Sequence, residues 1–210
     1  MNFDFFINNV SKIQQEKLGG LEAQLKLAPE IRKKIQLDTT TKNNARKAAV
    51  MALFYPNEHN DTILVLTKRA SYKGTHSAQI SLPGGKFDET DLNLESTALR
   101  ECYEEIGVHT ELITVFKEMT DVYIPPSNFL VTPFLSYSLE KPIFKSNYEV
   151  AEIIQVPMEE VLDEKSIAFK NMSTSYDKNA NIPYFNLQEN TVWGATAMII
   201  SEIKELFKSL

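Results

Sequence analysis

The sequence predicts a single α+β domain built on a mixed β-sheet, with a short helical arm in front of it. Segments with strand-like patterns outnumber segments with helical spacing, and the two kinds are mixed along the chain. The 210 residues, 43% of them hydrophobic, supply one full core and are few for two domains. We find no internal repeat and no low-complexity segment that would indicate another architecture.

The predicted arm occupies residues 1–44. Its first helix lies between positions 2 and 17, where apolar residues recur at helical spacing behind Asn2, a candidate N-cap: Phe3, Phe6, Ile7, Val10 and Ile13. Gly19-Gly20 ends this helix, and Pro29 begins a short helix over residues 29–36. A polar stretch from Asp38 to Asn44 follows. The arm is too short to be a second domain, so we expect it to pack on the main body.

The main domain is predicted to span residues 45–210 and to begin with two strands, 47–55 and 62–67, on either side of a turn cluster. A loop from Lys68 to Ser81 then leads to Pro83-Gly84-Gly85, a strong turn signal. Helical patterning begins near Leu94 and stops at Gly107, a suitable C′ glycine. The elements expected after it are strands at 111–121, 129–138 and 150–156, a short helix at 158–162, paired strands at 166–171 and 182–187 around a turn at 177–181, and an amphipathic helix at 195–208.

The overall charge and the single cysteine restrict the class of protein. A net charge of −6 and a pI near 5.2 do not suit general binding to nucleic acid or to anionic membranes, which requires a basic face. No apolar run approaches the roughly 18 residues of a membrane span, and the N-terminus lacks a secretory signal. Cys102 cannot form an internal disulfide, and its place in an apolar stripe predicts a buried side chain. We therefore expect a cytoplasmic protein.

Three glutamates share one face of the helix that ends at Gly107. At about 100° per residue, with Glu101 as the origin, Glu105 falls at about +40° and Glu104 at about −60°. Clustered carboxylates repel one another and oppose the helix dipole in the last turn, by a few tenths to about 1 kcal/mol each. Bound Mg²⁺ or Mn²⁺ would reverse both effects, because hard cations prefer carboxylate oxygens. A solvated acidic face is the alternative interpretation.

The residues around this helix resemble the Nudix box, G-x5-E-x7-R-E-U-x-E-E-x-G-U, in which U is a bulky aliphatic residue. The matching residues are Gly85, Arg100, Glu101, Glu104, Glu105, Gly107 and Val108. Cys102 takes the first aliphatic position, the stretch from Gly85 to Arg100 is one residue longer than the general pattern, and Asp91 stands where the first glutamate is expected. A longer box with Asp in this region, followed by Thr-Ala-Leu-Arg-Glu, is similar to the coenzyme A pyrophosphatase branch of the superfamily.

The segment before the box resembles a further signature of that branch, L-L-T-x-R-S-x3-R-x3-G-Q-x-S-F-P-G-G. The matching residues are Thr67, Arg69, Gln79, Ser81 and Pro83, and the departures are Gly74 for the second Arg, Ala78 for Gly and Leu82 for Phe. The resemblance implies the Nudix fold, a mixed sheet sandwiched between helices (α/β/α). It also implies hydrolysis of the diphosphate of coenzyme A or acyl-CoA to 3′,5′-ADP and (acyl-)4′-phosphopantetheine.

The resemblance also implies roles for individual residues. Metal binding is assigned to Glu101, Glu104 and Glu105, completed by backbone groups of Gly84 and Gly85, and Arg100 is expected to orient a glutamate of the box. The expected contacts to a small nucleotide substrate are Arg69, Lys86, Gly84, Ser127 and Asn128. A solvated side chain is the alternative interpretation for Lys86, and a turn is the alternative for Ser127 and Asn128.

The general base and the exact activity stay open in the sequence. Many Nudix enzymes take the base from a later loop or strand, where Glu149 and Glu152 are the candidates; we prefer Glu149 because it precedes the strand, at a loop expected to border the cleft. Two surface glutamates are the alternative. Hydrolysis of ADP-ribose, NADH or a nucleoside triphosphate is a second candidate function, and a binding module without turnover is a third. The arm is also a candidate surface for a homodimer.

Overall fold

The structure is a computed structural model, and it describes residues 1–33, 43–70, 79–173, 179–208 and 210. Several sequence expectations fall wholly or partly outside these residues: the end of the 29–36 helix, the polar stretch 38–44, Gly74 and Ala78 of the substrate signature, and the turn at 177–181. Among the described helices, none is both long enough and apolar enough to cross a membrane.

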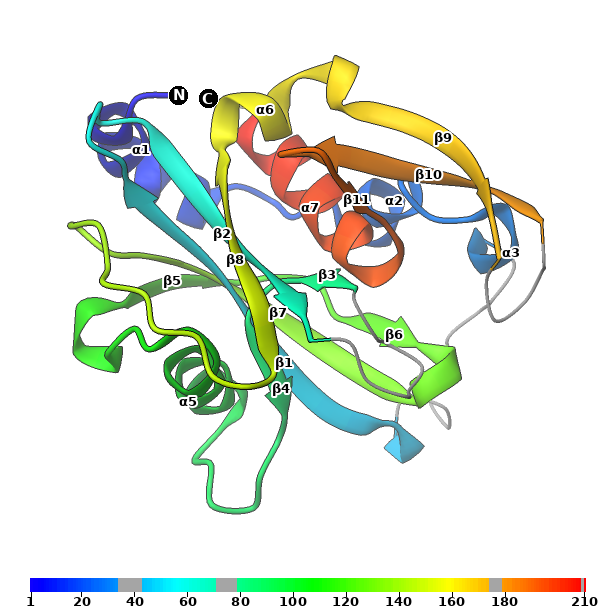
Figure 1. Ribbon diagram of the computed structural model, residues 1–210, viewed down its shortest axis with the longest axis horizontal. Helices are drawn as coiled ribbons and strands as arrows, with labels where there is room; N and C mark the ends of the chain where they lie inside the picture. Colours follow the sequence, from blue (N-terminus) through cyan, green and yellow to red (C-terminus); the bar gives the residue numbers. More distant parts are fainter. Residues whose placement is uncertain (34–42, 71–78, 174–178, 209) are drawn as a thin grey trace.

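An eight-stranded mixed sheet forms the centre of the described fold (Figure 1). Its main path runs through β3 (Ile80–Ser81), β2 (Thr62–Arg69), β1 (Arg46–Pro56), β7 (Phe129–Tyr137) and β5 (Thr114–Glu118). Off this path, β1 also pairs with β4 (Gly84–Lys86), β7 with β6 (Val122–Ile124), and β2 with β8 (Val150–Pro157). Strands β1 and β7 are parallel, whereas the other pairs are antiparallel. The sheet is therefore mixed, as the sequence predicts.

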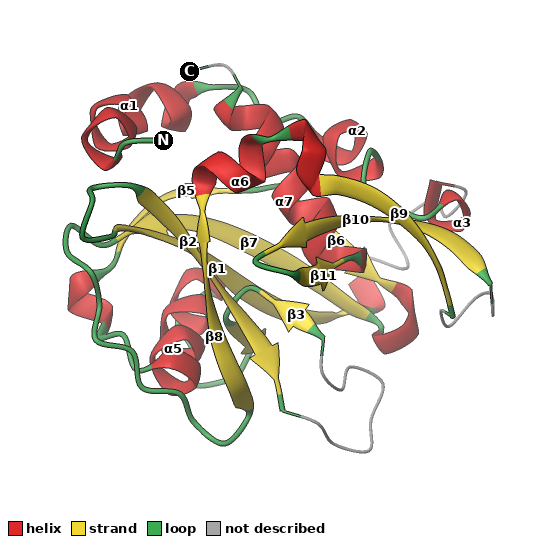
Figure 2. Ribbon diagram, turned by 45° about the horizontal axis from the view of Figure 1, so that its top comes forward, coloured by secondary structure: helices red, strands yellow, loops and turns green. Residues whose placement is uncertain are grey.

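Helices cover both faces of this sheet (Figure 2). Successive side chains of a strand point to opposite faces, so Ala52 and Phe54 of β1 enter one core while Met51 and Leu53 enter the other. Helix α5 (Leu94–Ile106) packs on the second face. The first face carries α1 (Phe3–Gln15), α6 (Met158–Leu162) and α7 (Gly194–Phe207). The α/β/α arrangement is confirmed.

A second, antiparallel sheet lies against α6 and α7 (Figure 1). It consists of β9 (Ile167–Met172), β10 (Ala180–Leu187) and β11 (Asn190–Val192). The predicted pairing of strands at 166–171 and 182–187 is confirmed, because β9 and β10 pair from Ile167↔Phe185 to Met172↔Ala180. The short strand β11 was not anticipated.

The N-terminal segment contributes side chains to the central core. Asn2 caps α1 as expected, its side chain accepting a hydrogen bond from the Phe5 N–H at 3.2 Å. Phe6 is fully buried and its ring lies 5.3 Å from that of Phe54 and 5.9 Å from that of Phe207. Two short helices follow, α2 (Gly20–Leu25) and α3 (Glu30–Lys33). The glycine pair thus stands at the start of a second helix, which the sequence did not indicate.

Two other expectations need correction. Gly84 and Gly85, expected in a turn, begin strand β4, because their backbone pairs with Val50 and Ala49 of β1. The single strand expected at 111–121 is instead a 3₁₀ helix η1 (Thr110–Leu112) followed by β5. Further 3₁₀ turns are η2 (Pro125–Ser127) and η3 (Glu164–Ser166). Pairing with β1 thus decides the conformation of Gly84 and Gly85, whereas in the second segment pairing with β7 begins only at Thr114.

Candidate active site

Helix α5 carries the acidic face that the sequence predicts. Asn93 caps its N-terminus in a reciprocal capping box with Ser96, and Gly107 ends it in the left-handed conformation with φ 74°. The apolar stripe is buried against the sheet, and Cys102 is fully buried within it. This packing fixes the rotation of the helix, so that the three glutamates lie at its edge at different depths.

Glu105 is the deepest of the three carboxylates, with 3% of its surface exposed. One carboxylate oxygen accepts a hydrogen bond from the Gly84 N–H at 3.0 Å, and the other lies 3.8 Å from Nη1 of Arg69. Burial raises the pKa of Glu105 to about 7, and the negative charges of Glu101 and Glu149 add to this effect. A buried carboxylate with unused oxygen lone pairs is a strong candidate ligand for a cation.

Glu101 lies against the backbone of Gly85. A Cβ atom at position 85 would fall 2.4 Å from the carboxylate carbon of Glu101, so the missing side chain of glycine is what allows this approach. Burial raises the pKa of Glu101, while the hydrogen bond from Arg100 Nη1 at 2.9 Å lowers it. Gly85 and Glu101 therefore form one side of the candidate metal site.

Arg100 is fixed by Asp91, a residue to which the sequence assigned no role. The guanidinium donates to both Asp91 oxygens, from Nε at 2.8 Å and from Nη2 at 3.0 Å, and these bonds hold the pKa of Asp91 well below its usual range. Thr97 donates to the same carboxylate at 2.8 Å. Held in this way, Arg100 reaches Glu101 and, at 3.4 Å, Glu104. The position of Asp91 at the place of the first box glutamate was the available signal.

Arg69 and Glu149 complete the described cluster. Nη2 of Arg69 lies 3.4 Å from a carboxylate oxygen of Glu149, so the arginine contacts both Glu149 and Glu105. The other candidate base, Glu152, pairs with Lys68 at 3.3 Å. Among the residues that the structure describes, neither Glu152 nor Lys68 forms a hydrogen bond or ion pair with a glutamate of α5. The structure thus brings Glu149, and not Glu152, to the acidic face of α5.

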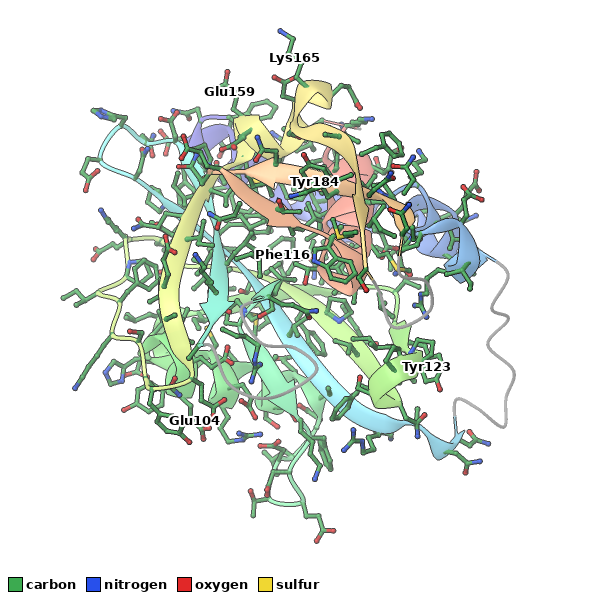
Figure 3. All side chains as sticks on the ribbon, turned by 45° about the vertical axis from the view of Figure 1, so that its right-hand side comes forward. Glu104, Phe116, Tyr123, Glu159, Lys165 and Tyr184 are labelled. Atoms are coloured by element: carbon green, nitrogen blue, oxygen red, sulfur yellow. The ribbon has the colours of Figure 1, made fainter. Side chains whose placement is uncertain are left out.

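The remaining predicted substrate residues, Lys86, Ser127 and Asn128, form no side-chain hydrogen bond or ion pair with the glutamates of α5 among the described residues. The Lys86 side chain is exposed, and its carbonyl accepts a hydrogen bond from Arg100 at 3.1 Å. Ser127 and Asn128 lie beyond the end of β6, where Tyr123 donates to the Asn128 side chain at 3.0 Å and Arg46 to the Ser127 carbonyl at 2.6 Å. Figure 3 shows Tyr123 well apart from Glu104. Substrate contacts by Ser127 and Asn128 stay predictions.

The donor set fits a divalent cation. Two carboxylates with raised pKa values, Glu101 and Glu105, stand beside a glycine backbone, and hard oxygen donors of this kind suit Mg²⁺ or Mn²⁺. Within the described residues, no three acidic, histidine or cysteine side chains already converge as a closed metal cage. Glu104, the most exposed of the three, is turned toward Arg100.

Comparison with known proteins identifies the class. The NUDIX domain family matches residues 45–174, and the chain belongs to this family. It is a Nudix hydrolase, a pyrophosphatase of a family whose members generally use divalent metal ions.

Relatives of known sequence support the same class. The protein named uncharacterized Nudix hydrolase NudL of Enterobacter sp. strain 638 is 30% identical over 167 residues, which cover 76% of this chain and 82% of the relative. The protein of the same name from Photorhabdus laumondii is 29% identical over 143 residues, covering 68% and 75%. Nudix hydrolase 15, mitochondrial, of Arabidopsis thaliana is 30% identical over 162 residues, covering 74% of this chain and 56% of that protein.

Solved structures confirm the Nudix fold. The crystal structure of the Nudix hydrolase RenU from M. smegmatis aligns with a TM-score of 0.57 at 19% identity, over 79% of this chain and 88% of that chain. A MutT/nudix family protein from Enterococcus faecalis aligns with a TM-score of 0.53 at 14% identity, over 96% and 74%. At these identities the likeness shows the fold alone.

Proposed function

We propose that this Nudix hydrolase cleaves the diphosphate of coenzyme A or acyl-CoA to 3′,5′-ADP and (acyl-)4′-phosphopantetheine, with Mg²⁺ or Mn²⁺. The observation that carries the substrate assignment is the position of the second signature. Arg69, which belongs to that signature, lies 3.8 Å from Glu105, which belongs to the Nudix box. Arg69 and Glu105, far apart in sequence, therefore meet at one place in the fold.

The other matching residues of the signature support this assignment. The backbone N–H of Arg69 donates to the Gln79 carbonyl at 3.0 Å, and the hydroxyl oxygens of Thr67 and Ser81 lie 3.2 Å apart. Nε of Arg69 is buried and has no hydrogen-bond partner among the described residues. This atom is out of reach of a ligand, but the Arg69 side chain is 28% exposed, so its terminal guanidinium nitrogens can contact a phosphate oxygen of the substrate. This is the contact we expect for Arg69.

The residues of the site divide the work of hydrolysis. Glu101, Glu104 and Glu105, with the backbone of Gly85, would hold the metal, which when bound neutralises the diphosphate and acidifies water. Arg100, itself held by Asp91, orients Glu101 and Glu104. Glu149 accepts a proton as the water oxygen bonds to phosphorus, and the electron pair of the broken P–O bond leaves with the other phosphate.

A turnover assay over a substrate panel tests this function. Coenzyme A, acetyl-CoA, ADP-ribose, NADH and a nucleoside triphosphate are compared with Mg²⁺, with Mn²⁺ and with a chelator. We expect coenzyme A or acetyl-CoA to give the highest kcat/KM, and the chelator to remove activity. A clear preference for ADP-ribose or NADH would reject coenzyme A as the substrate. Binding of these compounds without any turnover would favour a regulatory module.

A further inference from the structure

We propose that Arg69 is a positioning residue that holds the carboxylate of Glu149 beside the metal-binding Glu105. The inference rests on the proposed function, in which Glu149 is the general base. In addition to contacting a phosphate of the substrate, the guanidinium of Arg69 would then act on the reaction through Glu149.

Two backbone hydrogen bonds hold the chain in place at Arg69 and Ala70. Its N–H donates to the Gln79 carbonyl at 3.0 Å, and the next N–H, of Ala70, donates to the Glu149 carbonyl at 2.7 Å. The register between β2 and β8 shifts between Lys68 and Arg69, so that Arg69 lies opposite Val150 instead of Ala151. This bulge brings Glu149 one position closer to Arg69 than regular pairing would, and bulges commonly re-aim side chains next to active sites.

The guanidinium of Arg69 lies between two carboxylates of different depth. Nη2 lies 3.4 Å from Glu149 and Nη1 lies 3.8 Å from Glu105, while the exposed fractions of these side chains are 41% and 4%. The negative charge of Glu149 contributes to the raised pKa of Glu105, so the two carboxylates repel each other across the site. The positive charge of Arg69, in contact with both carboxylates, offsets this repulsion. Without Arg69, the more exposed Glu149 would turn toward solvent.

The neighbouring ion pair provides a comparison within the same two strands. Lys68 and Glu152 face each other at 3.3 Å across β2 and β8, with 39% and 53% of their side chains exposed. Neither contacts the α5 glutamates among the described contacts. This pair lies next to Arg69 and Glu149, of which Glu149 directly precedes β8, and it has no connection to the metal site, so Lys68→Gln is a matched control.

A double-mutant cycle on kcat, measured at saturating substrate, separates positioning from other roles. The variants are Arg69→Gln, Glu149→Gln, their combination, Arg69→Lys and Lys68→Gln, each checked for folding by thermal unfolding. We expect Arg69→Gln to lower kcat about 10- to 100-fold, as loss of a supporting partner typically does. In the Glu149→Gln background the same change should lower kcat less than about threefold, because the carboxylate that it positions is already absent. Arg69→Lys should retain part of kcat, and Lys68→Gln should stay within about twofold of the wild type.

The outcomes distinguish this inference from the function on which it rests. A wild-type protein that hydrolyses no diphosphate substrate rejects the proposed function. Given turnover, equal losses of kcat from Arg69→Gln in both backgrounds, or a rise in KM with unchanged kcat, overturn the positioning role. Full kcat in Glu149→Gln overturns it as well, since no base would then be held.

Discussion

At the scale of single residues, the environment of Glu105, which we propose as a metal ligand, raises the pKa of its carboxyl group. Its charge is stabilised by one backbone N–H and by Arg69, and it is destabilised by burial and by two negative neighbours. Burial prevails, and the pKa rises to about 7. Near neutral pH the metal-free site therefore accepts a proton readily, and a divalent cation would compete with that proton for the same oxygens.

This balance predicts how stability depends on pH. A carboxyl group whose pKa is raised on folding, here from 4.5 to about 7, destabilises the fold progressively between these two values and fully above the upper one. Replacing Glu105 by Gln should therefore increase the unfolding free energy of the metal-free protein at pH 8, by up to about 3 kcal/mol. Urea unfolding with a chelator measures this gain, which should shrink as the pH falls toward 4.5.

The control is Glu104→Gln, because the Glu104 side chain is 53% exposed and should give no comparable gain. A Glu105→Gln variant as stable as the wild type at every pH would contradict the account of Glu105.

At the scale of elements, strand β4 connects the sheet to α5 through two adjacent glycines with different surroundings. A Cβ on Gly84 would lie 2.3 Å from the Ala49 carbonyl oxygen and 2.6 Å from the Val50 Cα, both backbone atoms that cannot move independently. A Cβ on Gly85 would meet only the carboxylate of Glu101, the end of a flexible side chain, among its nearest atoms. The packing of β4 on β1 therefore requires a glycine at position 84, and the close approach of Glu101 requires one at position 85.

The two alanine substitutions should therefore have different effects. Gly84→Ala should lower the unfolding free energy by about 3 kcal/mol, since β4 must separate from β1. Gly85→Ala should keep most of the stability but displace Glu101 and weaken Mn²⁺ binding about 10- to 100-fold. Thermal unfolding and a Mn²⁺ titration measure both effects. The distinction between the two glycines would be wrong if both variants lost the same stability and Gly85→Ala bound Mn²⁺ as tightly as the wild type.

The elements also show what sequence patterns contain and what they omit. Helix α5 and strands β1, β2 and β7 were predicted nearly in full, because each carries its own periodicity and its own end signals. Strands β4, β6 and β11 have three residues each and were missed, since only their partner strands define them. In the site, the motif predicted the acidic face of α5. The motif position of Asp91 pointed to the residue but not to its partner, because its pairing with Arg100 depends on how the chain folds back over nine positions.

At the scale of the whole molecule, the N-terminal segment is tied to the main core by more than apolar contacts. The carboxylate of Glu202 in α7, fully buried, accepts hydrogen bonds from the Gly20 N–H, from Gln24 and from Thr120. Ser201 donates to the Ala23 carbonyl at 2.7 Å. The family match begins at residue 45, yet the core of this protein includes side chains from its first turn.

Two neighbouring phenylalanines test this dependence. Phe6→Ala should lower the unfolding free energy by about 3–5 kcal/mol, because it empties a fully buried position among Phe54, Phe116 and Phe207. Phe5→Ala, at a side chain that is 46% exposed, is the control and should cost less than about 1 kcal/mol. Chemical denaturation of both variants measures the difference. A small effect of Phe6→Ala would mean that the segment is dispensable for the fold.

The central claim is that the carboxylates of α5, beside the glycine backbone of β4, hold the divalent ion on which hydrolysis depends. The most direct test is the rate of coenzyme A hydrolysis by Glu105→Gln with saturating Mg²⁺, measured alongside its unfolding curve. We predict that kcat falls about 100-fold or more. The variant should remain folded, with an unfolding free energy no lower than that of the wild type. A folded Glu105→Gln protein that hydrolyses coenzyme A at the wild-type rate would contradict the account.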